Sequence, residues 1–155
     1  MKLSQGVEWT MHCVSLLALL PSGVTVRREQ FAGHYGLPEA YLAKHLQAVT
    51  KAGILRATPG PRGGYQLARP ATDITLLDIV EAIEGSARPF ICQEIRLQGS
   101  GALSPEDCHG LCRINLAMNQ ADNAWRSTLR ATTVADIAND LPGNIRERNK
   151  KLFAP

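Results

Sequence analysis

Apolar residues recur at helical spacing in the first third of the chain. Between Ser4 and Leu20 they fall every three or four positions, and the Pro-Ser-Gly that follows ends the pattern. A second helix is predicted over 27–35, with Thr25 as its cap. A third is predicted over 38–52, because proline suits the first turn of a helix and a glycine follows the last residue.

A short β-hairpin is predicted after the third helix. Two extended runs, 54–58 and 65–67, flank a turn rich in proline and glycine. A fourth helix is predicted from Thr75 to Glu84, and Asp78 gives Thr75 the spacing of a capping box. Three helices followed by a hairpin is the order of a winged helix-turn-helix, whose third helix enters the major groove of DNA. We therefore expect a mainly α fold with a small β-hairpin wing.

The second half of the chain carries a different apolar pattern. Spacings of three and four residues predict a coiled-coil-like seam on a long helix through which the chain dimerises. A further helix after Thr133, boxed by Asp136, is expected to cover the long helix and to end near Leu141. The seam consists of Leu111, Ile114, Met118, Ala121, Trp125 and Thr128.

These patterns divide the chain into four segments. We expect a winged helix-turn-helix DNA-binding domain over 1–85, a cysteine-bearing loop over 86–112 and dimerisation helices over 113–142. The basic tail over 143–155 is expected to be solvated and disordered.

The positive charge is concentrated in the predicted DNA-binding domain. The net charge is +3, but residues 1–70 hold eight Lys/Arg against three Asp/Glu (+5), and residues 71–155 hold nine against eleven (−2). Because lysine and arginine release counterions when they neutralise phosphates, we expect double-stranded DNA as the partner. The residues expected to contact it are Arg27, Arg28, Tyr41, Lys44, Gln47, Lys51, Arg62, Gly63 and Gly64.

Other functional classes lack support in the sequence. No apolar run of the 155 residues approaches the ~18 of a membrane span, and we expect a cytoplasmic protein that binds no membrane. A cysteine–histidine enzyme would need an orienting acid and an oxyanion hole, and the sequence offers no motif for either. We expect no enzyme activity and no small-molecule substrate.

Four short segments together resemble the Rrf2 family of bacterial winged-helix transcriptional regulators. They are Gly-Val-Glu-Trp from Gly6, Tyr-Leu-Ala-Lys from Tyr41, Gly-Pro-Arg-Gly-Gly-Tyr from Gly60 and Ile-Thr-Leu-Leu-Asp-Ile-Val from Ile74. The resemblance implies a homodimer that binds a partly palindromic operator. It also implies an iron–sulfur cluster whose state governs DNA affinity, since many members hold one.

The cysteine spacing departs from the closely spaced triplet of the best-known cluster-binding members. Fifteen residues separate Cys92 from Cys108, and three separate Cys108 from Cys112. This spacing, together with Glu8 and His12, is most similar to the redox-sensitive Rrf2 regulators. The resemblance implies a [2Fe–2S] cluster held by Cys108 and Cys112 of one subunit and by the glutamate and histidine of the other.

The chemistry of these residues is compatible with such a site. Glu8 and His12 are four apart on a predicted helix and therefore share a face. Cys108 and Cys112 share a side if the turn that begins at Ser104 continues, and otherwise they lie in a loop broken by glycine. Replacing a thiolate ligand by histidine raises the reduction potential of an iron–sulfur centre, which suits a redox switch.

Several residues have a second interpretation. Cys92 is expected to pack in the core, with ligation less favoured, and His109 is a minor ligand candidate; Cys13 is expected to be a core thiol. Trp9 has two interpretations. It either transmits the redox state of the cluster to the DNA-binding domain over 1–85, called the reading head below, or is an ordinary packing residue.

Two metal-related alternatives stay open. The chain could instead be a metal-free, thiol-based regulator that senses oxidants or electrophiles, with Cys108 and Cys112 as a reversible disulfide. A zinc-stabilised module is the other possibility, and it would lack redox chemistry at the metal.

Overall fold

The computed structural model describes residues 2–104 and 106–153, which divide into two compact units. One unit is formed by residues 2–86 together with 129–153, and the other by residues 87–128. The first contains the predicted reading head and the second contains three of the four cysteines.

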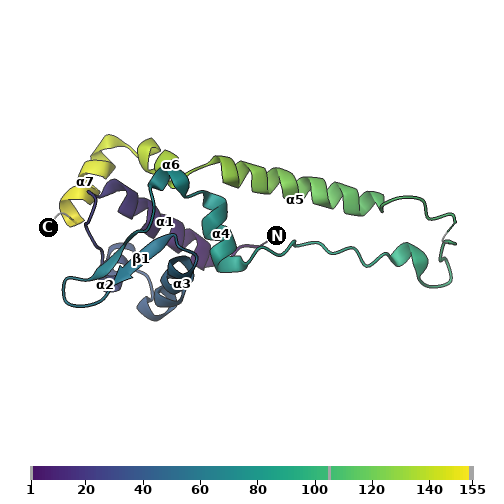
Figure 1. Cartoon of the computed structure of the whole chain (residues 1–155), viewed down its shortest axis with the longest axis horizontal. Helices are drawn as coiled ribbons and strands as arrows, with labels where there is room; N and C mark the ends of the chain where they lie inside the picture. The colour runs from purple at the N-terminus through teal and green to yellow at the C-terminus, as the bar shows by residue number, and fades with distance from the viewer. Residues whose placement is uncertain (1, 105, 154–155) are drawn as a thin grey trace. The chain divides into compact units, whose positions relative to one another are not determined.

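The first unit is a set of helices around α1 (Gln5–Leu19), which packs against four other helices (Figure 1). This helix begins at Gln5, one residue after the start of the predicted pattern at Ser4. The four helices that contact α1 are α3 (Glu39–Lys51), α4 (Leu76–Glu84), α6 (Val134–Asp140) and α7 (Gly143–Phe153). The remaining helix of the head, α2 (Arg28–Tyr35), packs on α3, as in a helix-turn-helix.

The core of this unit comes from the apolar stripes of the predicted helices. Val14 and Leu16 of α1, Phe31 of α2 and Leu42 and Leu46 of α3 have almost no exposed surface. Cys13 is fully buried among them, as predicted from its place on the apolar side of α1. Burying side chains of this size contributes roughly 1.5–3 kcal/mol each and fixes the orientation of α3 on α1.

The hairpin forms as predicted. Strand β1 (Leu55–Thr58) pairs antiparallel with β2 (Gly64–Leu67), with Leu55 opposite Leu67. Val26 adds an isolated bridge, because its N–H and C=O both bond to the backbone of Tyr65. The wing is therefore hydrogen-bonded to the backbone just before α2.

Thr25 does not cap the second helix, contrary to the prediction. Its hydroxyl donates to the carbonyl oxygens of Arg62 and Gly63, each at 3.3 Å. The N-cap of α2 is Arg27, whose N–H bonds to the side chain of Gln30 at 2.9 Å. Thr25 thus ties the wing turn to the segment that leads into the reading head.

The C-terminal region differs most from prediction. The capping box of Thr133 and Asp136 is confirmed at the start of α6, and this helix packs on α1. The tail was expected to be disordered, but its residues 143–153 form α7. The Phe153 ring lies 5.1 Å from that of His34, and Asn149 is buried, so α7 packs within the first unit.

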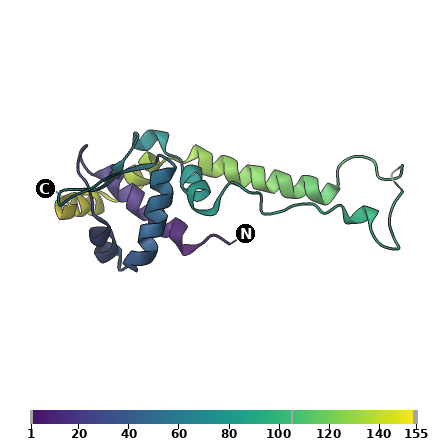
Figure 2. The same cartoon turned by 60° about the horizontal axis from the view of Figure 1, so that its bottom comes forward.

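The second unit consists of an extended segment, 87–112, and most of α5 (Arg113–Ala131). The segment contains one short 3₁₀ helix, Ile95–Leu97, and its first part runs beside α5 in both views (Figures 1 and 2). Within the described part of α5, Asp122 alone is buried. No helix among the described residues is long and apolar enough to cross a membrane.

Candidate functional site

The third helix presents a polar face opposite its buried stripe. Tyr41 is 67 % exposed, and Lys44, Gln47 and Lys51 are also exposed. Leu42 and its partners on the other side are buried, so the polar face stays free while the apolar face anchors the helix. Lysine and glutamine can reach phosphates and base edges from such a face.

Arg28 behaves differently from the other predicted DNA contacts. Its guanidinium lies 2.7 Å from the carboxylate of Glu39, in the first turn of α3, and 3.5 Å from that of Glu29. The side chain therefore connects α2 to α3 and is not a free cation. Arg27, at the N-cap of α2, is exposed.

The tip of the wing combines one exposed arginine with two glycines that the backbone requires. Arg62 is exposed. A Cβ on Gly63 would lie 2.0 Å from the carbonyl oxygen of Thr58, and Gly64 has a φ of +146° with the backbone of Val26 2.8 Å from its Cβ position. These glycines shape the turn that carries Arg62, which explains their place in the motif.

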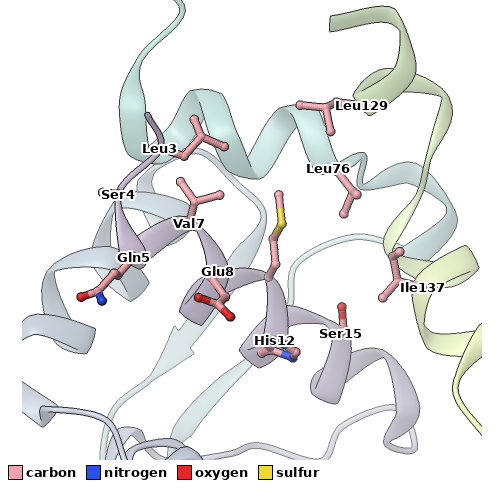
Figure 3. A pocket seen from close by; sticks show the side chains of 11 residues that line it. Leu3, Ser4, Gln5, Val7, Glu8, His12, Ser15, Leu76, Leu129 and Ile137 are labelled. Carbon is pink, nitrogen blue, oxygen red and sulfur yellow. The ribbon is translucent and has the colours of Figure 1, made fainter. Parts of the chain in front are cut away.

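Glu8 and His12 are both exposed on α1 and line one pocket of about 600 Å³ (Figure 3). The rest of its wall is mostly apolar and comes from α1 and the two residues before it, from α4 and α6, and from Leu129 near the end of α5. The ring of Tyr35 lies 5.6 Å from that of His12 and its hydroxyl donates to the His12 carbonyl. The structure thus keeps the carboxylate and the imidazole on a common face, open to a further ligand.

Trp9, the next residue after Glu8, faces α3. Its half-buried ring meets the ring of His45 edge-on, with centroids 6.2 Å apart. The same histidine ring lies against Gly6, where a Cβ would come within 2.3 Å of it. The contact joins the helix that bears the candidate ligands to the reading helix.

In the second unit the side chains of Cys92 and Cys112 lie close together. A sulfur from each and a carboxylate oxygen of Glu94 lie within 4.8 Å of one another. Cys92 is half-buried and lies outside the hydrophobic core, in contrast to the core packing expected for it. Cys108 is also half-buried but does not belong to this group, and His109 is exposed.

Arg96 connects the two arms of the cysteine loop, a role that the sequence analysis missed. Its Nε donates to Glu94 at 2.6 Å and its Nη2 donates to the carbonyl of Gly110 at 3.3 Å. Its positive charge also helps to lower the pKa of Cys112. Glu94 has a φ of 50°, an uncommon value for a residue with a Cβ, and this conformation places it beside Arg96.

The start of α5 favours a thiolate at Cys112. Its pKa is lowered chiefly because the backbone N–H groups of Asn115 and Ile114 bond to the sulfur, and also because of Arg96 and the Cys92 thiol. The Asp107 N–H donates to the Ser104 hydroxyl, which donates to the Asp107 carboxylate. The turn predicted at Ser104 does not continue as a helix, because none follows in 106–112, where Gly110 takes a φ of 69°. Cys108 therefore lies in a loop.

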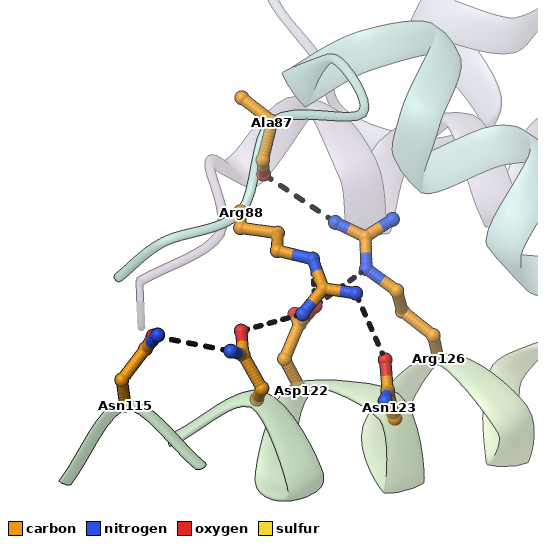
Figure 4. Close-up of polar contacts among 7 residues, drawn as sticks. Ala87, Arg88, Asn115, Asp122, Asn123 and Arg126 are labelled. Carbon is orange, nitrogen blue, oxygen red and sulfur yellow. Dashed lines mark hydrogen bonds and ion pairs between the residues drawn. The ribbon is translucent and has the colours of Figure 1, made fainter. Parts of the chain in front are cut away.

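A cluster of polar side chains joins the start of the segment 87–112 to α5 (Figure 4). Arg126 donates to Asp122 at 3.0 Å and to the carbonyl of Ala87 at 3.4 Å. Arg88 bonds to the side chains of Asn119 and Asn123 from the other side. The start of the extended segment is thereby held against α5.

The donor atoms of the loop suit a soft or borderline metal. Thiolate sulfurs bind iron and zinc, and a carboxylate adds a harder ligand to the same position. Cysteines at both ends of the loop with an arginine between them also suit an anionic centre such as an iron–sulfur cluster. The residues present in this unit therefore fit the group that the resemblance implies.

Comparison with known proteins identifies the family. Residues 3–140 match the family model Rrf2, described as an iron-dependent transcriptional regulator. The protein aau3 of Rhizobium meliloti is 35% identical over 140 residues, covering 88% of this chain and 82% of that protein. The protein rrf2 of Nitratidesulfovibrio vulgaris is 29% identical over 140 residues, covering 90% and 89%.

Solved structures have the same fold. CymR, the global cysteine regulator of B. subtilis, aligns with a TM-score of 0.70 at 23% identity, covering 92% of this chain and 99% of its own. IscR of T. potens aligns with a TM-score of 0.67 at 23% identity, covering 94% and 96%. The winged-helix architecture predicted from the sequence is confirmed, and the chain belongs to the Rrf2 family of transcriptional regulators.

Proposed function

We propose that the protein is a homodimeric DNA-binding regulator whose operator affinity changes with the redox state of a [2Fe–2S] cluster. In this proposal residues 1–85 read the operator, α5 pairs with its copy, and the loop over 86–112 supplies thiolate ligands. The observation that carries it is the place of the Cys112 thiol beside Cys92 and Arg96 in the loop, in a member of a family described as iron-dependent.

DNA binding is supported by the geometry of the head. Lys44 and Gln47 lie on the free face of α3, and the wing turn carries Arg62 to an exposed position. The excess positive charge of residues 1–70 supplies attraction to phosphates that does not depend on sequence.

Pairing of α5 with a second copy is supported by its uncovered apolar residues. Ile114 and Met118 on α5 are 64 % and 41 % exposed, and Leu111 just before the helix is 64 % exposed. Large apolar side chains gathered on one face usually mark an interaction surface. The exposure of these three residues of the predicted seam supports dimerisation through α5.

We propose Cys108 and Cys112 of one subunit as the thiolate ligands, with Glu8 and His12 of the other completing the set. Glu8 and His12 support this by sharing an open face, and Cys112 by its place at the start of α5. Such a cluster supplies a one-electron change between two oxidation states when bound.

Trp9 gives α1 a route to the reading helix. The ring follows Glu8 in the chain and contacts His45 on α3, beside Lys44. A displacement of α1 at Glu8 therefore reaches the helix that contacts DNA. Because the two heads of a dimer must match a fixed half-site spacing, a small rotation of each head changes affinity.

The test is purification without oxygen, followed by an absorption spectrum and iron and sulfide analysis. We expect a coloured protein with iron and sulfide in equal amounts. Cys108→Ala and Cys112→Ala should each lose the colour and the redox response of binding to an operator selected from random DNA. His109→Ala is the matched control and should keep both, and a colourless, iron-free wild type would refute the cluster.

A metal-free thiol regulator is the second candidate, and the position of Cys92 favours it. Its sulfur lies within 4.8 Å of the Cys112 sulfur, an arrangement that needs no metal. The two candidates differ in one measurement, because a thiol regulator keeps its redox response in protein that contains no iron.

A further inference from the structure

We infer that Cys92 and Cys112 form a reversible disulfide when the metal-free chain meets a peroxide. The sequence left open a disulfide between Cys108 and Cys112, which are close in the chain. The structure instead places the Cys92 sulfur within 4.8 Å of the Cys112 sulfur. This inference does not depend on the cluster, although both would use Cys112.

Arg96 holds the two arms of the loop at the distance that this reaction needs. Its guanidinium bonds to Glu94, two residues after Cys92, and to the carbonyl of Gly110, two residues before Cys112. A further bond joins the N–H of Leu103 to the Arg96 carbonyl at 2.8 Å. The cysteines are therefore neighbours in the folded loop although nineteen residues lie between them.

The surroundings leave room for the sulfurs to close to bonding distance. Both cysteines are half-buried, so a small oxidant can reach them, and the described residues of the loop around them have no regular structure except Ile95–Leu97. Side-chain rotation and small backbone shifts can bring together sulfurs at this separation. The fully buried Cys13 lies in the core of the first unit and is protected.

The chemistry balances with hydrogen peroxide as the oxidant. The Cys112 thiolate attacks one peroxide oxygen, the O–O bond breaks, and a sulfenic acid and hydroxide form. Cys92 gives up its proton and attacks the Cys112 sulfur, forming the S–S bond and releasing the hydroxyl group as water. Two thiols are oxidised by two electrons, and the peroxide becomes two molecules of water.

Trypsin distinguishes the two possible pairings. It does not cut Arg-Pro bonds, so Cys92 lies in the peptide 63–96, whereas Cys108 and Cys112 share the peptide 97–113. The experiment treats reduced, metal-free protein with stoichiometric hydrogen peroxide and then alkylates and digests it without a reductant. We expect the free thiols to fall from four to two per chain and the peptides 63–96 and 97–113 to be linked.

Variants make the assignment specific. Cys92→Ser should prevent the linkage, whereas Cys108→Ser should leave it intact and thereby identify Cys112 as the partner. Arg96→Met should slow the loss of thiols several-fold, with Arg130→Met, at an exposed arginine on α5, as the control. Circular dichroism on each variant checks that the fold is kept.

Each of three results would overturn the inference. These are a disulfide inside the peptide 97–113, a disulfide between chains on a non-reducing gel, and unchanged thiol content after treatment. Iron analysis has no part in these readouts, so they are independent of whether the cluster proposal succeeds.

Discussion

Arg126 donates a hydrogen bond to Asp122 at 3.0 Å, one turn earlier on α5, and the two side chains are 14 % and 5 % exposed. Arg88 approaches the same carboxylate oxygen at 3.9 Å from the extended segment. The second unit buries no large apolar side chain among its described residues, so this charged cluster is a main contact between the segment and α5.

We expect Asp122→Ala to lower the free energy of unfolding by about 2 kcal/mol, because it removes the carboxylate that holds two arginines. Asp140→Ala, at an exposed position on α6, should change it by less than ~0.5 kcal/mol. Urea unfolding measures both, and equal midpoints for the two variants would show that the cluster does not stabilise the fold.

Gly63→Ala should distort the wing, since the new methyl group would meet the carbonyl of Thr58. We expect a loss of about 2 kcal/mol in stability and a clear loss of operator affinity. Gly33→Ala on α2 is the matched control, because nothing lies within 4 Å of its Cβ position. Alanine should stabilise this helix by roughly 0.5–1 kcal/mol.

Lys44→Ala should weaken DNA binding on all sequences and reduce the slope of log affinity against log salt by about one. Lys150→Ala, at an exposed lysine near Glu147 on α7, should leave the slope unchanged. Fluorescence anisotropy at several salt concentrations gives both slopes. A reduced slope for Lys150→Ala would extend the DNA interface to α7.

Trp9→Ala should reduce the ratio of operator affinities between the oxidised and reduced protein, because it removes the contact with His45. Trp9→Phe keeps an aromatic edge and should retain most of this ratio. If Trp9→Ala lowers both affinities equally, the ring has only a packing role.

The pH dependence of stability should report on two histidines. Burial, and to a smaller extent the charge of Arg148, lowers the pKa of His34. Burial and the charge of Lys44 lower the pKa of His45, and the charge of Glu84 opposes this with a smaller effect. Since both folded pKa values lie below 6.5, the unfolded chain binds more protons as the pH falls through 6.5.

Stability should therefore be complete above pH 6.5 and decrease as the pH falls from there through the folded pKa values. The loss is small, because both rings keep partial contact with water. Urea midpoints measured over this range, with His34→Gln as the comparison, check it. The variant should show a weaker pH dependence, and an identical curve would assign the effect to other groups.

The local patterns of the sequence were sufficient for the reading head. Leu42 and Leu46 at helical spacing, the box of Thr75 and Asp78, and the glycine turn before Tyr65 predicted α3, α4 and the wing. Each signal acts within a few residues through backbone geometry, so it can be read without knowledge of the rest of the fold.

Contacts between distant residues could not be read in this way. The preference of Cys112 for Cys92 depends on Arg96, whose guanidinium bonds to both arms of the loop. The tail is ordered because Phe153 meets His34, across more than a hundred residues. Periodicity and capping determined the helices, whereas only the packing of separate segments decided which thiols, rings and charges became neighbours, because chain separation does not fix distance in a folded protein.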